Sequence, residues 1–216
     1  MSRPSTLALA VLSMLGEAEL KGQAAMHPYK MQQLIKERGK DEVVNVGQRA
    51  SLYRTIDRLH KAGLVRVLES ERQDNRPERT LFALTDEGRR TWRTWMLDAL
   101  STPTRHYPEF PAAIAFIPLL EPAEVLEQLE KRRVKLVSEL ERVETVLAES
   151  AQWARLFTLE MEYLRATTAA ELGWVESLVG DLRAGSVTWS AEWLAAMASQ
   201  QPPGGADEEH GQDAAH

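Results

Sequence analysis

The chain has 216 residues, a length that supports one large or two small domains without a stabilising metal ion or disulfide. It contains no cysteine, which excludes disulfides, thiolate metal sites and thiol nucleophiles and agrees with a reducing cytoplasm. The net charge of −6 is unevenly spread, because residues 1–100 carry 17 Lys and Arg against 13 Asp and Glu, whereas residues 101–216 carry 9 against 19. A basic half suits an anionic partner such as DNA, although excess charge is also common on an ordinary solvated surface.

The first predicted element is a helix over residues 5–16, where apolar residues are nearly continuous and Ser5 or Thr6 can cap the N-terminus. Its apolar run spans about ten residues, whereas a membrane-spanning helix needs roughly 20. Glu17 and Glu19 follow directly. A secretion signal or membrane anchor is therefore the weaker interpretation, and a cytoplasmic location is expected.

Two further helices are predicted after a loop at residues 16–25. The second helix begins at His27 and Pro28 and ends near Gly39, since proline favours the first helical position. A polar connector then leads to Gly47. The third helix is indicated by apolar residues at helical spacing that end at a glycine C-cap, namely Leu52, Ile56, Leu59, Ala62 and then Gly63.

A hairpin and a fourth helix complete the N-terminal half. Residues 64–68 and 80–84 are predicted strands on either side of a polar turn at residues 69–78, and a helix capped by Thr85 or Asp86 runs to Pro103. Three helices, two strands and a helix within about 90 residues form the winged variant of the helix-turn-helix. Its third helix enters a major groove about 12 Å wide.

Polar side chains on the third helix and in the wing turn are the predicted DNA contacts. The third helix has an apolar stripe on one side and a polar face on the other, so one side can pack on the core while the other reaches base edges and phosphates. The turn between the strands is rich in arginine, which suits phosphate or minor-groove contacts. The predicted contact residues are Gln48, Arg49, Ser51, Tyr53 and Arg54 on the helix and Arg72, Asn75, Arg76 and Arg79 in the wing.

Two residues of the third helix also have structural interpretations. Tyr53 can be a core aromatic residue whose hydroxyl reaches the surface. Arg58 is as well suited to a structural salt bridge with Asp57 or Glu87 as to DNA, so it is not included among the predicted contacts.

The second half is predicted to be helical. Residues 106–122 hold a short apolar helix between prolines, and residues 122–149 follow a 3/4 alternation of apolar positions that favours coiled-coil-like packing. A helical stretch over residues 153–183 supplies a partner for it. The Pro- and Gly-rich end of the chain predicts a disordered tail. We therefore expect a mainly α fold with a winged helix-turn-helix at 1–101, a helical dimerisation and possible effector domain at 102–199 and a tail at 200–216.

The sequence ASLYRTIDRLHKAGLV at residues 50–65, followed by RPERTLFALTDEGRR at residues 76–90, resembles the PadR family of bacterial transcriptional regulators. The resemblance covers residues 5–100. It implies a dimeric winged helix-turn-helix, usually a repressor, whose helical C-terminal region completes the dimer and can sense a small molecule. It places Ser51, Tyr53 and Arg54 on the recognition helix and Arg76 and Arg79 in the wing. The link between Gly16 and Tyr29 looks longer than the family pattern.

Other chemistries find little support in the sequence. None of the five histidines has a neighbour at metal-site spacing, and the chain lacks GxSxG, P-loop and GxGxxG motifs. We therefore expect no catalytic site, no metal and no cofactor. Trp92 and Trp95, in the helix after the wing, are candidate effector-binding residues, although tryptophans at such positions more often belong to the core.

The sequence thus favours a homodimeric, sequence-specific DNA-binding regulator, a repressor that reads a palindromic operator with half-sites on the order of 10 bp apart and is released by a small-molecule ligand. One alternative is a winged-helix module that binds protein without DNA. Another is a small-molecule sensor without DNA affinity. The arginines of the wing and the recognition helix favour DNA over both.

Overall fold

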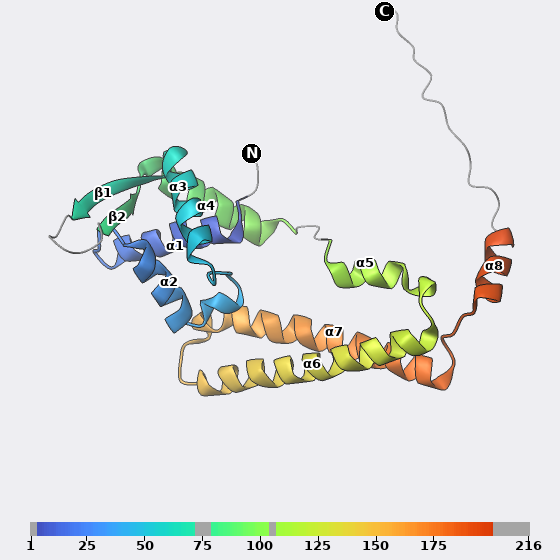
Figure 1. Cartoon of the computed structure of the whole chain (residues 1–216). Helices are drawn as coiled ribbons and strands as arrows, with labels where there is room; N and C mark the ends of the chain where they lie inside the picture. The colour runs from blue at the N-terminus through green and yellow to red at the C-terminus, as the bar shows by residue number, and fades with distance from the viewer. Residues whose placement is uncertain (1–3, 72–78, 104–106, 201–216) are drawn as a thin grey trace, which may run out of the picture. The chain divides into compact units, whose positions relative to one another are not determined.

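The computed structural model describes residues 4–71, 79–103 and 107–200, and the side chains of residues 69–71, 79, 198 and 200 are outside the description. The chain divides into two compact units, residues 1–106 and residues 107–216 (Figure 1). Each unit has its own helices and its own apolar core.

The N-terminal unit has the predicted order of elements. Its elements are α1 (Thr6–Leu20), α2 (Pro28–Glu37), the 3-10 helix η1 (Lys40–Glu42), α3 (Arg49–Lys61), β1 (Val65–Glu71), β2 (Arg79–Leu84) and α4 (Asp86–Ser101). The two strands form one antiparallel hairpin, in which Val65 pairs with Leu84. The arrangement is a helix-turn-helix followed by a wing.

The first helix is longer than the sequence indicates. We expected a loop from Gly16, but α1 continues to Leu20, and Gly16 is a buried residue within the helix. A Cβ at Gly16 would be 3.8 Å from Leu84 and 3.9 Å from Trp92, so this position lies against both the wing and α4. Part of the long link predicted between Gly16 and Tyr29 is therefore helix.

One apolar core joins the three helices to the base of the wing. The buried stripe of α3, opposite its polar face, is part of this core, as expected from the spacing of its apolar residues. The core includes Val11, Leu12, Leu15, Met31, Ile35, Val46, Leu52, Ile56, Leu59, Val65 and Leu84.

A buried hydrogen bond fixes the connector between α2 and α3. Gln32 is buried, and its Nε2 donates to the carbonyl of Val46 at 2.6 Å. One residue later, the Gly47 amide donates to Oδ1 of Asn45. Because a buried amide without a partner is costly, these bonds hold the chain that leads into α3 in one position.

The wing hairpin has a third partner that the strand pattern does not reveal. Met26, just before α2, pairs with Phe82 of β2: the Met26 amide donates to the Phe82 carbonyl at 2.9 Å, and the Phe82 amide donates back at 3.1 Å. The pairing uses the free edge of β2. It ties the start of α2 to the wing.

α4 packs against α1 and the base of the wing. Trp92 Nε1 donates to Ser13 Oγ at 2.9 Å, and Arg89 forms ion pairs with Glu19 of α1 and with Asp86. The hydrogen bond from Arg89 holds the pKa of the exposed Asp86 carboxyl below its usual value. The fourth helix is thus joined to the first by polar as well as apolar contacts.

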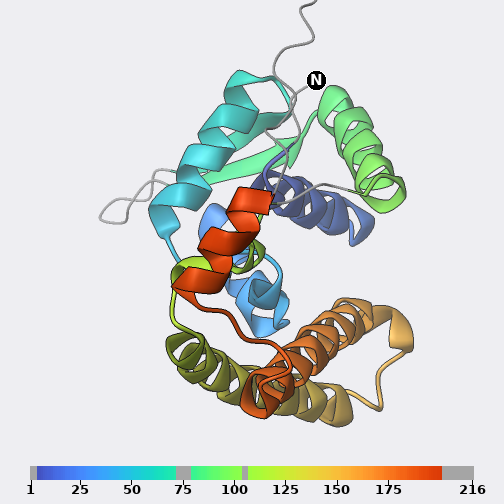
Figure 2. The same cartoon turned by 90° about the vertical axis from the view of Figure 1, so that its right-hand side faces the viewer.

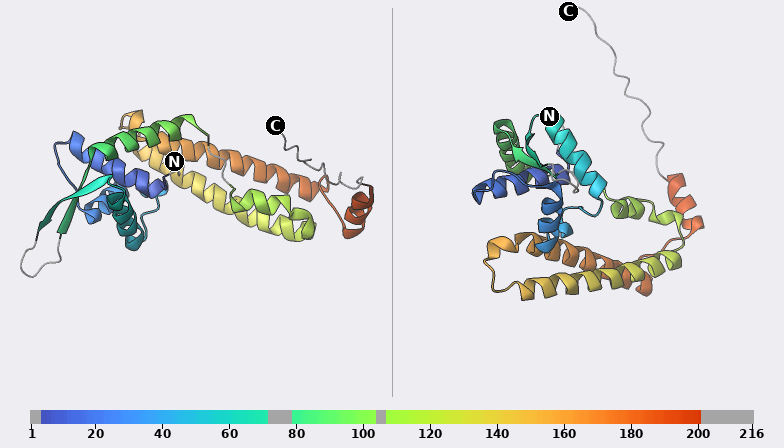
Figure 3. Two further views of the ribbon diagram at one scale, coloured as in Figure 1. Left: turned by 90° about the horizontal axis from the view of Figure 1, so that it is seen from above. Right: turned by 60° about the vertical axis from the view of Figure 1, so that its left-hand side comes forward.

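All regular secondary structure in the described residues of the C-terminal unit is helical. The unit contains α5 (Glu109–Ala115), η2 (Ile117–Leu119), α6 (Pro122–Glu149), η3 (Arg155–Phe157), α7 (Leu159–Ala184) and α8 (Ala191–Gln200). The long helices α6 and α7 lie side by side and run in opposite directions, as two further views show (Figures 2 and 3). The bounds predicted for α6, Pro122 to Glu149, are confirmed.

The two long helices form a hairpin with its own apolar core, and α5 packs on it. Val125 and Leu129 of α6 meet Val175 and Val179 of α7. Beside this core, the Arg132 guanidinium lies 3.5 Å from the centre of the Phe110 ring, which meets Trp174 edge to face at 5.9 Å. Arg132 Nε also donates to Glu171 at 2.7 Å. These contacts hold the short helix against the hairpin.

Candidate nucleic-acid interface

The recognition helix α3 separates its two chemical faces cleanly. Leu52, Thr55, Ile56 and Leu59 are buried against the unit's core. The residues predicted to contact DNA lie at its N-terminus and along its first two turns, where Gln48, Arg49, Tyr53 and Arg54 are exposed and Ser51 is half-buried. Core packing thus leaves this polar surface free, as insertion into a groove requires.

Three of these side chains form a small network along the helix. Ser51 Oγ donates to Gln48 Oε1 at 3.5 Å, and Arg54 Nη2 donates to Ser51 Oγ at 3.3 Å. Arg54 Nε also donates to the carbonyl of Ala50 at 3.3 Å. The network restrains the Arg54 side chain, which keeps further N–H groups for a base edge or a phosphate.

Arg49 and Tyr53 extend from the same end of α3. The guanidinium of Arg49 lies over the ring of Tyr29 from α2, 5.3 Å from the ring centre. Tyr53 is 47% exposed and is not part of the N-terminal core cluster. Its hydroxyl forms no hydrogen bond with the residues that the structure describes, so it is accessible to a phosphate. Its contact with DNA stays a prediction.

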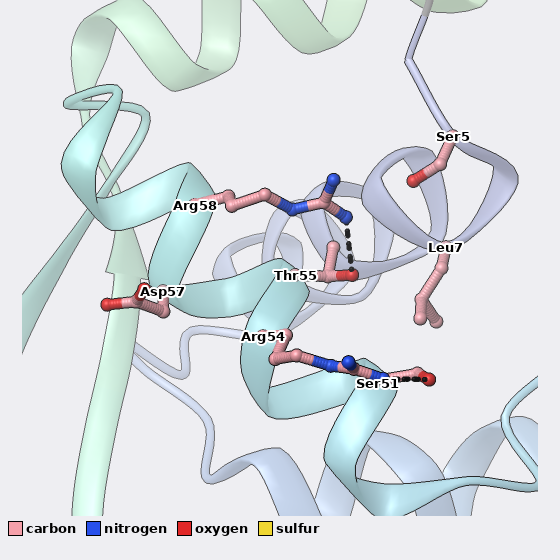
Figure 4. A pocket seen from close by; sticks show the side chains of 7 residues that line it. All are labelled: Ser5, Leu7, Ser51, Arg54, Thr55, Asp57 and Arg58. Atoms are coloured by element: carbon pink, nitrogen blue, oxygen red, sulfur yellow. Dashed lines mark hydrogen bonds between the residues drawn. The ribbon is translucent and has the colours of Figure 1, made fainter.

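An open groove of about 540 Å³ lies between the N-terminus of α1 and α3. Figure 4 shows the Arg54 and Arg58 side chains extending from α3 beside the groove, together with Ser5, the N-cap of α1, and Leu7 of that helix. Asp57 pairs with Lys61 at 2.8 Å, while Arg58 Nη2 donates to Thr55 Oγ1 at 3.2 Å. The salt bridge considered for Arg58 therefore does not form in this structure.

Arg58 joins the candidate interface for this reason. Arg58 follows Arg54 by four positions, so both lie on one side of the helix. That spacing was visible in the sequence. The sequence did not show that Asp57 pairs with Lys61 and not with Arg58.

The predicted wing contacts fall mostly beyond the described residues. Arg72, Asn75 and Arg76 lie outside them. Arg79 is the first residue of β2, where its backbone pairs with Glu71, but its side chain is not described. DNA contact by the wing therefore stays a prediction.

The tryptophans predicted to bind an effector pack within the N-terminal unit. Trp92 and Trp95 are half-buried and lie against the core cluster, and the indole N–H of Trp92 is occupied by Ser13. Neither lines the groove beside α3 or a second cavity of about 330 Å³ at the turn between α6 and α7. These contacts favour the core interpretation, and an effector site there stays a prediction.

Two further features are absent from the part of the chain that the structure describes. It contains no group of three or more His, Asp or Glu side chains arranged to hold a metal ion. In the same residues, no helix combines the length and apolar character needed to cross a membrane.

The comparisons with known proteins match this geometry. Residues 15–94, which run from α1 through the wing to α4, match the model of the transcriptional regulator PadR-like family. The chain contains a PadR-like domain. Among curated proteins, none matches this sequence.

Solved structures of other regulators resemble this chain over 82–83% of its length. PadR from Bacillus subtilis in complex with operator DNA is 17% identical, with a TM-score of 0.62 over 82% of this chain and 99% of that protein. The same protein in complex with p-coumaric acid is 16% identical, with a TM-score of 0.63 over 83% of this chain and 99% of that protein. The Vibrio cholerae virulence activator AphA is 16% identical, with a TM-score of 0.59 over 83% and 99%.

The likeness confirms the predicted fold class, a PadR-like winged helix-turn-helix with a two-stranded wing followed by long C-terminal helices. The family and these neighbours are transcriptional regulators. The predicted resemblance, drawn from α3 and the second strand of the wing, is confirmed by a match that begins further upstream, within α1.

Proposed function

We propose that this protein is a sequence-specific DNA-binding transcriptional regulator that acts as a homodimer on a palindromic operator. The observation that carries the proposal is α3, whose buried apolar stripe leaves Arg49, Tyr53 and Arg54 exposed on a PadR-like domain. The operator DNA in the structure of Bacillus subtilis PadR supports it. An adaptor that binds only protein would have no reason to gather these donors.

Dimerisation through the C-terminal unit, with help from α4, accounts for apolar side chains that the single chain leaves exposed. On α4, Leu100 is 80% exposed and Leu97 is also exposed. In the C-terminal unit, Phe116, Leu119 and Tyr163 are exposed. A dimer interface formed by these elements would cover such side chains. Two recognition helices then read half-sites on the order of 10 bp apart.

Repression follows if the bound dimer excludes RNA polymerase from a promoter. Release follows if a small molecule prefers a dimer whose recognition helices are wrongly spaced, because a ligand shifts an equilibrium only by its differential affinity. The p-coumaric acid bound to Bacillus subtilis PadR supports a ligand-responsive regulator. AphA, by contrast, is a virulence activator, so a separate experiment must distinguish repression from activation.

The decisive experiment titrates purified protein against the DNA upstream of its own coding region, with scrambled competitor, at two salt concentrations. Tight, selective and salt-sensitive binding is expected. Selection from random DNA is the second arm, because it also detects a distant operator. Recovery of no preferred sequence in that selection would overturn the proposal and favour the protein-binding module. Reporter transcription with the recovered site then distinguishes repression from activation.

Removal of the wing arginines tests the second contact surface. The double substitution Arg76→Ala and Arg79→Ala is expected to weaken binding to all sequences alike and to reduce the salt slope by about one unit per lost phosphate contact. Binding isotherms at four salt concentrations measure it. Arg165→Ala, which removes an exposed arginine of α7, serves as the control. An unchanged slope in the double variant would exclude the wing as a phosphate contact.

The Tyr53 hydroxyl is tested by Tyr53→Phe. If the hydroxyl reaches a phosphate, its loss is expected to cost about 1 kcal/mol or less of binding free energy, which corresponds to about fivefold in affinity or less. Fluorescence anisotropy with the selected operator measures the change. Unaltered affinity would favour a purely structural Tyr53.

A further inference from the structure

Tyr29 and Arg49 form a stacked pair between the two helices of the helix-turn-helix. Tyr29 lies in the first turn of α2, and Arg49 is the first residue of α3. The 5.3 Å between the guanidinium carbon and the ring centre is within the range of a cation–π interaction. Tyr29 is 51% exposed, so much of its surface lies beyond the core.

The guanidinium of Arg49 differs from those of the other arginines on α3. Arg54 donates to Ser51 and Ala50, and Arg58 donates to Thr55. Arg49, by contrast, makes neither a hydrogen bond nor an ion pair within the described part of the chain. Its contact with Tyr29 uses the face of the guanidinium and leaves the N–H groups at its edge available.

Both members of the pair are placed by their own helices. His27 caps α2 by accepting from the Tyr29 amide at 3.1 Å, and Pro28 occupies the first position of the helix. The buried bond from Gln32 to the Val46 carbonyl fixes the chain that leads from α2 to α3. The ring thus meets Arg49 from a rigid position, and stacking reduces the freedom that the long side chain would lose on binding.

We propose that Arg49 contacts a phosphate of the DNA backbone at one edge of the major groove and that Tyr29 is the residue that positions Arg49. The proposal rests on the proposed DNA binding and adds to it a residue from α2. Arg49 and Arg58 are separated by two and a half turns at about 3.6 residues per turn, so they lie on opposite flanks of α3. Their phosphates would therefore lie on opposite sides of the inserted helix.

A double-mutant cycle on the selected operator tests the pair. Arg49→Ala is expected to lower the salt slope by about 0.9, the value for one phosphate contact on B-DNA. Tyr29→Leu keeps the charge of Arg49, so it is expected to weaken binding about 2- to 5-fold with the slope unchanged, as suits a cation–π contact at an exposed site. In the Arg49→Ala background, Tyr29→Leu is expected to cause no further loss.

Two conservative variants separate the stack from the stability of the helix. Tyr29→Phe keeps the ring and is expected to bind within about twofold of the unsubstituted protein. Arg49→Lys keeps the charge but lacks the planar group. Its affinity for the operator is expected to fall about 2- to 5-fold, with the salt slope unchanged. Arg49→Lys leaves Tyr29 and α2 untouched, so it tests the stack even where Tyr29→Leu lowers the melting temperature.

The matched control is the same cycle with Arg58→Ala, whose effect should add to that of Tyr29→Leu because Arg58 lies on the far flank. Additive losses for Tyr29→Leu and Arg49→Ala would overturn the stacked pair, as would an unchanged slope in Arg49→Ala or full affinity in Arg49→Lys. These results presuppose selective binding by the unsubstituted protein. Its failure to select any DNA would overturn the proposed function itself and this inference with it.

Discussion

Substitution of Gly88 by alanine is expected to destabilise the N-terminal unit by about 3 kcal/mol, at the upper end of the usual cost of overpacking. A Cβ at Gly88 would lie 2.0 Å from the carbonyl oxygen of Leu64. That oxygen belongs to the backbone at the start of the wing and accepts from the Thr85 amide at 3.1 Å. It has no flexible end that could move aside, so α4 would have to separate from the hairpin.

Thermal melts followed by circular dichroism measure this effect. A loss of about 3 kcal/mol lowers the melting temperature of a 100-residue unit by roughly 12–24 °C. Gly16→Ala is the matched control, since a Cβ there meets Leu84 and Trp92 at ordinary contact distance within α1. It is expected to be neutral or to stabilise by about 0.5 kcal/mol, because alanine suits a helix interior better than glycine. Equal melting temperatures for the two variants would contradict the close approach at Gly88.

Substitution of Arg54 by alanine is expected to have the largest effect on operator recognition. Arg54 is exposed near the middle of the polar face of α3, and Ser51 and the Ala50 carbonyl restrain its side chain. An arginine held in this way is suited to a bidentate contact with guanine, which contributes about 1–3 kcal/mol of discrimination against the wrong base. Affinity for the operator should fall by that amount, or about 5- to 150-fold.

Competition between the operator and single-base variants measures the predicted loss. Arg54→Ala should relax specificity at one base pair of each half-site, whereas loss of a phosphate contact would weaken all variants alike. Ser51→Ala is the graded control, because it removes one restraint on Arg54 but leaves its donors in place. Undiminished specificity in Arg54→Ala would assign Arg54 to the backbone of DNA.

The polar face of α3 also contains one carboxylate, that of Asp57. Asp57 lies one turn beyond Arg54 and would repel phosphates if it were unpaired. Its ion pair with Lys61 at 2.8 Å offsets the charge. A surface pair of this kind adds little to stability, so its main effect in the interface is electrostatic.

The sequence by itself determined the order of the elements and the polar face of the recognition helix. The apolar spacing of Leu52, Ile56 and Leu59 fixes which side of α3 is buried, and the exposed positions of Arg49 and Arg54 follow from helical geometry alone. In the same way, the long alternation of apolar residues predicted the paired helix from Pro122 to Glu149. Local periodicity is sufficient where one face of a helix must be buried.

Tertiary structure decided the features that depend on neighbours distant in sequence. Gly16 reads as a helix end, yet α1 continues through it, since the position is buried against Leu84 and Trp92. The pairing of Met26 with Phe82 and the stack of Arg49 on Tyr29 join segments that no periodic pattern connects. A residue's spacing fixes the face on which it lies, but only the packed fold determines which side chain meets it there.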